Sequence, residues 1–343
     1  MLRSVSLFIC ATLAIWAGGC RPPEYSAEAT AELTPEQQAA AEVAQRAEDK
    51  AAEEAAKKST FEERDSIRLT GAEKIKQMTA ICVDAQGRLY ICDAEAQRVR
   101  VVGADGKLVA SWKPGCVPQA IAIGGEKVFV AGKGQLVRLD LTGKVEQTLD
   151  IGKADLASMT ASDKYVFLSV RQESGFGVDR FSHALADRKT IVTGLRGCCG
   201  NMDLATDGKS LFAAENARHR VARFDFDGKE LSAFGESDRE KIEAFGSCCN
   251  PMNICLSPKG EVLTAETNPD RVKRYGADGK FIDLIGLFTR TKACSCVDLA
   301  ISPQGDRVYV GDTTNQVVRV LVPRAAGTTA TPATPSNTAA STH

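Results

Sequence analysis

The sequence predicts an all-β protein, a six-bladed β-propeller, preceded by a signal peptide and an α-helical stalk. Three observations predict this arrangement. A short apolar run follows the basic start of the chain, an Ala- and Glu-rich segment comes next, and short strands then recur over residues 66–323. Equivalent points of the six repeating units are 41, 40, 43, 50 and 45 residues apart. Four short strands at a period of about 40–45 residues are typical of propeller blades.

Each repeat contains a short alternating strand that follows a turn, and then a strand that carries an arginine. The first of these strands are Leu89–Cys92, Val128–Ala131, Val166–Ser169, Leu211–Ala214, Val262–Ala265 and Val308–Gly311. The last repeat ends near Val322, before a fourth strand. We therefore expect Ser66–Leu69, just before the first repeat, to supply that strand and close the ring, because closure removes an exposed sheet edge.

Residues 1–19 have the pattern of an export signal: a basic start, an apolar run over Val5–Ala17, and two glycines before Cys20. The run is shorter than the ~20 residues that a membrane-spanning helix needs. The small residues before Cys20 resemble a bacterial lipobox, although Ala17 stands where Leu is usual. The resemblance implies a lipoprotein that acylated Cys20 anchors in the bilayer. Arg21 then implies a cell-envelope location at the outer membrane, facing the periplasm; a plain secretory signal is the alternative.

Residues 20–65 are expected to form a lipid-anchored linker and a helical stalk. Thr34-Pro35 with Gln37 is a favourable helix start. The apolar stripe of this segment is almost entirely Ala and too small to bury a core, so it favours a solvated stalk over the alternative, a coiled-coil contact. The Ala/Thr/Pro tail at 324–343 is expected to be disordered.

Seven of the twelve cysteines fall in four short segments at one point of the repeat, the connection into a blade's innermost strand. These connections surround the central channel on one face of a propeller, so the thiols are predicted at one channel mouth. The seven are Cys116, Cys198, Cys199, Cys248, Cys249, Cys294 and Cys296.

Three residues after one cysteine of each segment comes a column that is mostly methionine. It contains every methionine after Met1, and we interpret its members as candidates to line the channel. They are Met78, Gln119, Met159, Met202 and Met252.

Three explanations of the sulfur-rich mouth stay open. Disulfides between neighbouring connections, such as one of Cys198/Cys199 with one of Cys248/Cys249, would tie blades together, and an oxidising export route favours them. A soft-metal or redox site would use the same ligands for Cu(I), with Zn or an iron–sulfur centre as further options. Buried, inert thiols are the third explanation; Cys82, Cys92 and Cys255 lie within strands and are expected in the core.

Segments such as Cys92–Val99, Ala214–Val221 and Gly311–Val317 resemble NHL repeats, in which an acidic residue, then Asn and Arg, precede a strand. The resemblance implies the propeller fold over about 250 residues. It does not define a function, because propellers of this type include enzymes, scaffolds and ligand binders. These acidic residues and the arginine column are interpreted as structural, as turn hydrogen bonds and solvated charges between strands.

The six-bladed shape is more distantly similar to the senescence-marker-protein/gluconolactonase family, in which Pro-Asn-Gly and Pro-Asp-Gly segments carry metal ligands. The matching positions here read Pro118-Gln119-Ala120 and Pro251-Met252-Asn253. Thioethers are poor ligands for Ca²⁺ or Mg²⁺. Asp203, Asn253 and Asp298, each one residue beyond the methionine column, could form a hard-metal site instead. Strand alternation turns them away from the methionine direction, so both sets cannot line the channel equally.

Composition reduces the number of function classes to consider. The net charge is −1 without a basic tract, which gives nucleic-acid binding no support. There are three histidines, and no catalytic residues are identified. The sequence favours a cell-envelope binding or scaffold module, monomeric, that uses the propeller face for a protein, peptide or glycan ligand. The alternatives are a soft-metal or redox-centre protein and a divalent-metal-dependent hydrolase or lactonase.

Overall fold

The structure is a computed structural model that describes residues 54, 57–198, 200–246, 249–267, 269–288 and 297–325. The predicted signal peptide, Cys20, most of the stalk and most of the tail lie outside these residues. Within the described part of the chain, no helix combines the length and the apolar character that crossing a bilayer requires.

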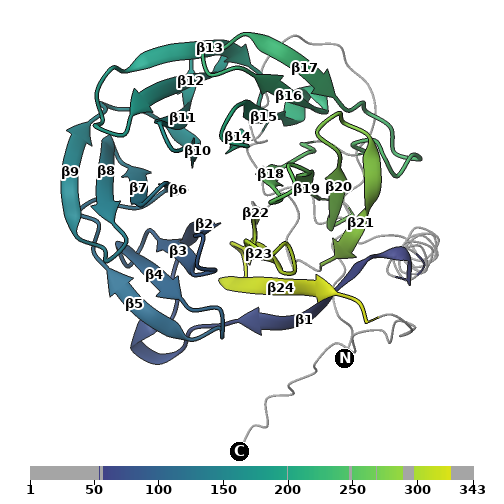
Figure 1. Cartoon of the computed structure of the whole chain (residues 1–343), viewed down its shortest axis with the longest axis horizontal. Helices are drawn as coiled ribbons and strands as arrows, with labels where there is room; N and C mark the ends of the chain where they lie inside the picture. Colours follow the sequence, from purple (N-terminus) through teal and green to yellow (C-terminus); the bar gives the residue numbers. More distant parts are fainter. Residues whose placement is uncertain are drawn as a thin grey trace, which may run out of the picture. The chain divides into compact units, whose positions relative to one another are not determined.

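The described strands form six four-stranded antiparallel sheets that surround a common centre (Figure 1). This arrangement confirms the predicted all-β, six-bladed propeller. Blade one contains β2 (Met78–Val83), β3 (Leu89–Asp93), β4 (Arg98–Val102) and β5 (Leu108–Trp112). Blade two contains β6 (Ala120–Gly124), β7 (Lys127–Gly132), β8 (Gln135–Asp140) and β9 (Val145–Asp150). Blade three contains β10 (Leu156–Ala161), β11 (Tyr165–Gln172), β12 (Gly175–Ser182) and β13 (Lys189–Leu195). Blade four contains β14 (Asp203–Thr206), β15 (Leu211–Glu215), β16 (Arg220–Phe224) and β17 (Glu230–Phe234); blade five contains β18 (Asn253–Leu256), β19 (Val262–Glu266), β20 (Arg271–Tyr275) and β21 (Phe281–Leu287); blade six contains β22 (Val297–Ile301), β23 (Val308–Asp312), β24 (Val317–Pro323) and β1 (Phe61–Ile67). The short 3-10 helices are η1 (Gly71–Glu73) and η2 (Asn216–Arg218).

The first strand of each sheet in blades one to five, and β22 in blade six, lie nearest the centre of the ring (Figure 1). Each of these inner strands contacts the inner strand of the next blade, and β22 contacts β2. The hydrophobic core is divided among the blade interfaces: six clusters of buried side chains fill the spaces between sheets.

A strand from the N-terminal side closes the ring, as predicted. β1 pairs with β24, from Phe61 opposite Pro323 to Ile67 opposite Val318. The strand lies earlier in the sequence than expected: it begins before residue 66, and Arg68 and Leu69 follow it. The charged run Glu62–Asp65 hides the strand in the sequence, because an outermost strand exposes most of its side chains to solvent.

The acidic residue at the end of the second strand is fully buried in four blades and paired with an arginine in each. In blade six, Arg319 Nη2 lies 3.0 Å from Asp312 Oδ2. In blade one, Asp93 also accepts hydrogen bonds from the backbone amides of Lys76 and Gln77, which lead into the inner strand. These carboxylates therefore serve the fold, but they are buried and not solvated as the sequence suggested. The four are Asp93, Glu215, Glu266 and Asp312.

Phe61→Ala tests the closure of the ring. Phe61 is 6% exposed and belongs to the hydrophobic cluster of blades five and six. Truncation should lower the free energy of unfolding by about 3–5 kcal/mol, the usual cost of emptying a buried Phe position. Val109→Ala on β5 is the control, because Val109 is 58% exposed. Urea unfolding measures both; an equal, small effect of the two substitutions would contradict a closing role for β1.

Candidate functional site

The inner strands surround a central cavity of about 380 Å³. All six of them contribute to its wall, so the propeller itself positions the site. No lysine, arginine or histidine lines it among the residues that the structure describes. The polar side chains that matter most in the wall are Thr79, Ser158, Asn201, Asp203, Asn253 and Asp298.

Asp203 connects three successive blades at this cavity. Its Oδ1 accepts a hydrogen bond of 2.5 Å from the Ser158 hydroxyl of blade three. Its Oδ2 accepts one of 2.7 Å from the backbone amide of Ile254 in blade five. The Ser158 hydroxyl in turn accepts a hydrogen bond from the backbone amide of Leu204. An inner strand has no partner strand on its channel side, and these side chains satisfy the amides left there.

Asp298 likewise satisfies a backbone amide of the next blade, where blade six meets blade one. Its Oδ2 accepts a hydrogen bond of 2.6 Å from the backbone amide of Ile81, and its Oδ1 accepts one of 2.8 Å from the backbone amide of Leu299. The side-chain amide of Asn253 also donates to the carboxylate of Asp298. Asn253 itself is 6% exposed, and its Oδ1 has no hydrogen-bond partner within the described chain. A buried acceptor without a donor is costly, so this oxygen marks a position where a ligand can donate a hydrogen bond.

Burial raises the pKa of both carboxyl groups. The pKa of Asp203 rises to about 7, because burial disfavours its charged form and the negative charge of Asp298 adds to that effect. Burial raises the pKa of Asp298 to about 6, while hydrogen bonds from Ile81, Leu299 and Asn253 oppose the rise. Both carboxyl groups therefore bind a proton more tightly than a free Asp side chain does.

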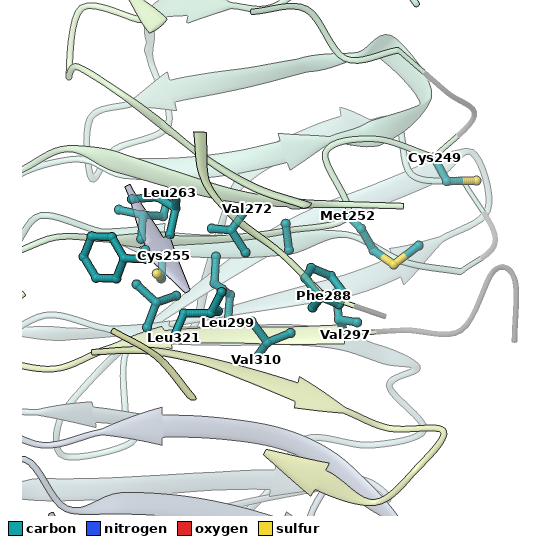
Figure 2. Packing of buried hydrophobic residues seen from close by; sticks show 14 of the residues in the cluster. Cys249, Met252, Cys255, Leu263, Val272, Phe288, Val297, Leu299, Val310 and Leu321 are labelled. Carbon is teal, nitrogen blue, oxygen red and sulfur yellow. The ribbon is translucent and has the colours of Figure 1, made fainter. Parts of the chain in front are cut away.

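Two thiols share this wall. Cys82 and Cys255 both line the cavity. Burial raises their pKa values well above the usual range, and the charges of nearby Asp residues raise them further. Both side chains are therefore neutral thiols at physiological pH. We expected Cys82, Cys92 and Cys255 in the core; Cys92 and Cys255 are buried there, and Cys255 packs among Leu263, Leu299 and Leu321 (Figure 2).

The structure brings two of the seven clustered cysteines together. The sulfurs of Cys198, in the connection into blade four, and Cys249, in the connection into blade five, are 2.8 Å apart. Cys116 lies elsewhere, buried with Cys92 and Trp112 between blades one and two. The other four lie outside the described residues: Cys199, Cys248, Cys294 and Cys296.

The methionine column and the acidic column occupy different positions, as strand alternation requires. Gln119 and Met159 line the cavity, whereas Met78, Met202 and Met252 are buried in clusters between blades and are not part of its wall. Met78 fits against blade six because Gly311 has no side chain: a Cβ there would lie 3.2 Å from its sulfur. The acidic set Asp203, Asn253 and Asp298 lines the cavity instead.

Sequence reasoning missed Ser158. The repeat alignment places Thr160, the residue after Met159, at the position of Asp203. The pairing of β10 with β11 is irregular between Leu156 and Ser158, and this shift brings the Ser158 hydroxyl to Asp203. A bulge of this kind has no composition signal, so only the register in the structure reveals it.

The arrangement can hold a positive charge. Asp203 accepts two of the hydrogen bonds described above and Asp298 accepts three, so both carboxylates retain acceptor capacity, and the free Asn253 oxygen adds a third acceptor group. No three His, Cys, Asp or Glu side chains are grouped to hold a metal ion in the part of the chain that the structure describes.

Comparisons with known proteins place the chain by its fold. No protein-family model matches the sequence, and no curated protein matches it. The fold is similar to that of a gluconolactonase from Xanthomonas campestris (12% identity, TM-score 0.54, covering 78% of this chain and 98% of that chain). It is also similar to hydrazine synthase from Kuenenia stuttgartiensis (16% identity, TM-score 0.51, covering 74% and 80%). At these identities the likeness defines the protein as a six-bladed β-propeller and goes no further.

The two raised pKa values predict how stability depends on pH. A free Asp carboxyl has a pKa of about 3.9, so the folded domain holds these protons more tightly than the unfolded chain does. Stability from this source is present below about pH 4 and is lost as the pH rises towards 7. In the unmodified chain, the free energy of unfolding should therefore decrease from pH 5 to pH 8. Asp203→Asn should make that decrease smaller by roughly 2–3 kcal/mol.

Urea unfolding at pH 5 and pH 8 measures this change. Asp163→Asn is the matched control, since Asp163 is exposed. An Asp203→Asn protein with the pH dependence of the unmodified chain would contradict the assignment.

Proposed function

We propose that the protein is a binding module of the cell envelope whose channel receives a primary ammonium group of a peptide or glycan ligand. The supporting observation is the imbalance of charge in the cavity wall. The carboxyl groups of Asp203, which is buried, and Asp298, which is partly buried, face the channel, and none of the described lining residues is basic. Leaving such charge uncompensated is costly, and a ligand cation would offset it.

The donors of an ammonium group match the acceptors of the cavity. An ammonium group carries three N–H donors. Asp203, Asp298 and the free Asn253 oxygen offer acceptors from three consecutive blades. Binding would also stabilise the ionised forms of both carboxyl groups, so affinity should increase as the pH rises through their pKa values of about 7 and about 6.

Location enters the proposal through the N-terminal sequence. The apolar run, the two glycines and Cys20 support export and acylation. We propose that acylated Cys20 holds the propeller at the bilayer, as a monomer in the cell envelope, and that the cysteine-bearing mouth has a structural role.

A divalent-metal-dependent hydrolase or lactonase is the second candidate. Asp203, Asn253 and Asp298 offer the oxygen ligands that Ca²⁺ prefers, and the free Asn253 oxygen favours this reading as well. It ranks second because Ca²⁺ takes six to eight oxygen ligands at close range. All four carboxylate oxygens already accept hydrogen bonds from the protein.

Ethanolamine and its neutral counterpart ethylene glycol test the proposed ligand chemistry. At pH 7.5 we expect ethanolamine to bind the propeller at least about tenfold more tightly, because charge-assisted hydrogen bonds contribute more than neutral ones. Asp298→Asn should remove the difference, and Asp163→Asn should preserve it. Calorimetry or ligand-observed NMR measures the affinities.

Two results would contradict this proposal. One is equal affinity for the two compounds. The other is hydrolysis of a glucono-lactone that depends on added Ca²⁺ and is lost in Asp298→Asn, which would favour the hydrolase.

Cys20→Ser tests the membrane anchor. Cells fed a palmitate analogue should label the unmodified chain and not the Cys20→Ser chain, which should move to the soluble fraction because a lipid chain is what retains the protein. Cys10→Ser, within the same signal, is the control and should still be labelled. An unmodified chain that takes up no label would support the plain secretory signal instead, and unchanged labelling of Cys20→Ser would contradict acylation at Cys20.

A further inference from the structure

We infer that Cys198 and Cys249 form a disulfide that joins blade four to blade five at the channel mouth. The two sulfurs are 2.8 Å apart, and both residues are buried, with 8% and 4% exposed. A disulfide has an S–S bond of about 2.05 Å, so forming it requires the sulfurs to approach by about 0.8 Å. Side-chain rotation can supply a movement of this size.

The same spacing argues against a shared metal ion. Two thiolates on a tetrahedral zinc ion lie about 3.7 Å apart, given Zn–S bonds of about 2.3 Å. The sulfurs of Cys198 and Cys249 are much closer than that. Figure 2 also shows the Cys249 sulfur pointing away from Met252, the nearest methionine of the column in the sequence, so the two sulfurs do not converge on one point.

Each cysteine is positioned by its own blade. The Cys198 amide donates a hydrogen bond of 2.6 Å to Oδ1 of Asn216, which is fully buried. Next to Cys249, Asn250 forms two hydrogen bonds of 2.9 Å with the backbone of Thr267. These hydrogen bonds hold the backbones next to Cys198 and Cys249, and this preorganisation favours their pairing.

The bond would also fix the wall of the cavity. Asn201 follows Cys198 by three residues and donates a hydrogen bond of 2.9 Å to the carbonyl oxygen of Met252. Asn253, with its free oxygen, comes next in the chain. The two cysteines are 51 residues apart, and the chain between them includes most of the longest step of the repeat, from Met202 to Met252. The cross-link would therefore hold Asn201 and Asn253 at a fixed separation across the interface of blades four and five.

The chemistry balances with an envelope thiol oxidoreductase as the oxidant. One cysteine, as a thiolate, attacks a sulfur of the oxidant's disulfide and forms a mixed disulfide. The second thiolate attacks the protein sulfur of that mixed disulfide and displaces the oxidant's thiolate. Two protons and two electrons leave the cysteine pair, and the oxidant becomes a dithiol. The need for this oxidant makes the inference rest on the proposed export.

Mass spectrometry of the full chain, expressed with its own export signal and alkylated before digestion, is the direct test. We expect two peptides joined through Cys198 and Cys249, with neither of these residues alkylated. Dithiothreitol treatment should separate the two peptides. Pairing of either residue with Cys199, Cys248 or another cysteine, or alkylation of both in the exported protein, would overturn the inference.

Thermal unfolding gives a second readout. Cys198→Ser and Cys249→Ser should each lower Tm by about 5–10 °C without reductant, because the unfolded chain loses a constraint. The double variant should fall no further than either single variant, since both remove one bond. Cys116→Ser, in the separate cluster of blades one and two, is the control and should retain the Cys198–Cys249 peptide pair. Additive losses in the double variant would contradict a shared bond.

Ethanolamine binding separates this inference from the proposed function. A cross-linked protein that does not distinguish ethanolamine from ethylene glycol would retain the disulfide and overturn the ligand proposal. A protein that binds ethanolamine more tightly than ethylene glycol, but in which Cys198 and Cys249 are both alkylated, would retain the ligand proposal and overturn the disulfide.

Discussion

The unpaired edges of six inner strands are the constraint on which this site depends. Every propeller turns one edge of each inner strand toward its channel, where backbone amides have no partner strand. This chain satisfies several of these amides with side chains from the preceding blade: Ser158 for Leu204, Asp203 for Ile254, and Asp298 for Ile81. The solution has a consequence. It brings carboxyl groups into a buried space, where their pKa values rise and their charge lacks a basic counterpart among the described lining residues.

The same alternation that directs these acids to the channel directs Met78, Met202 and Met252 away from it, whereas Met159 lines the cavity. A methionine and the residue after it lie on opposite sides of a strand. Met202 and Met252 therefore fill the spaces between blades, where a flexible side chain can adapt to irregular gaps. The methionine column is the more visible pattern in the sequence, yet it belongs to the packing. The less visible acidic column carries the charge of the cavity.

The sequence predicted the fold well because repetition and closure have strong physical signals. The spacing of the repeats indicated six blades, and the missing fourth strand indicated a contribution from the other end of the chain. The position of that strand was less predictable, since Glu62–Asp65 is an exposed edge segment without alternation. Of the site, sequence reasoning named Asp203, Asn253 and Asp298 but could not decide between them and the methionines. Ser158 depended on a bulge, which leaves no local pattern. The repeat alignment indicated that one of Cys198/Cys199 lies near one of Cys248/Cys249, but which two meet depends on loop conformations.

The site is distributed unevenly around the ring. Asp203, Asn253 and Asp298 come from blades four, five and six, and the Cys198–Cys249 contact lies where blades four and five meet. The matching position of blade two is Ala120, a small apolar residue. Because each blade packs mainly against its neighbours, a bond between two blades constrains their shared interface far more than the opposite side of the ring. A cross-link between blades four and five would therefore act beside the polar side chains of the cavity, and it would hold their spacing covalently.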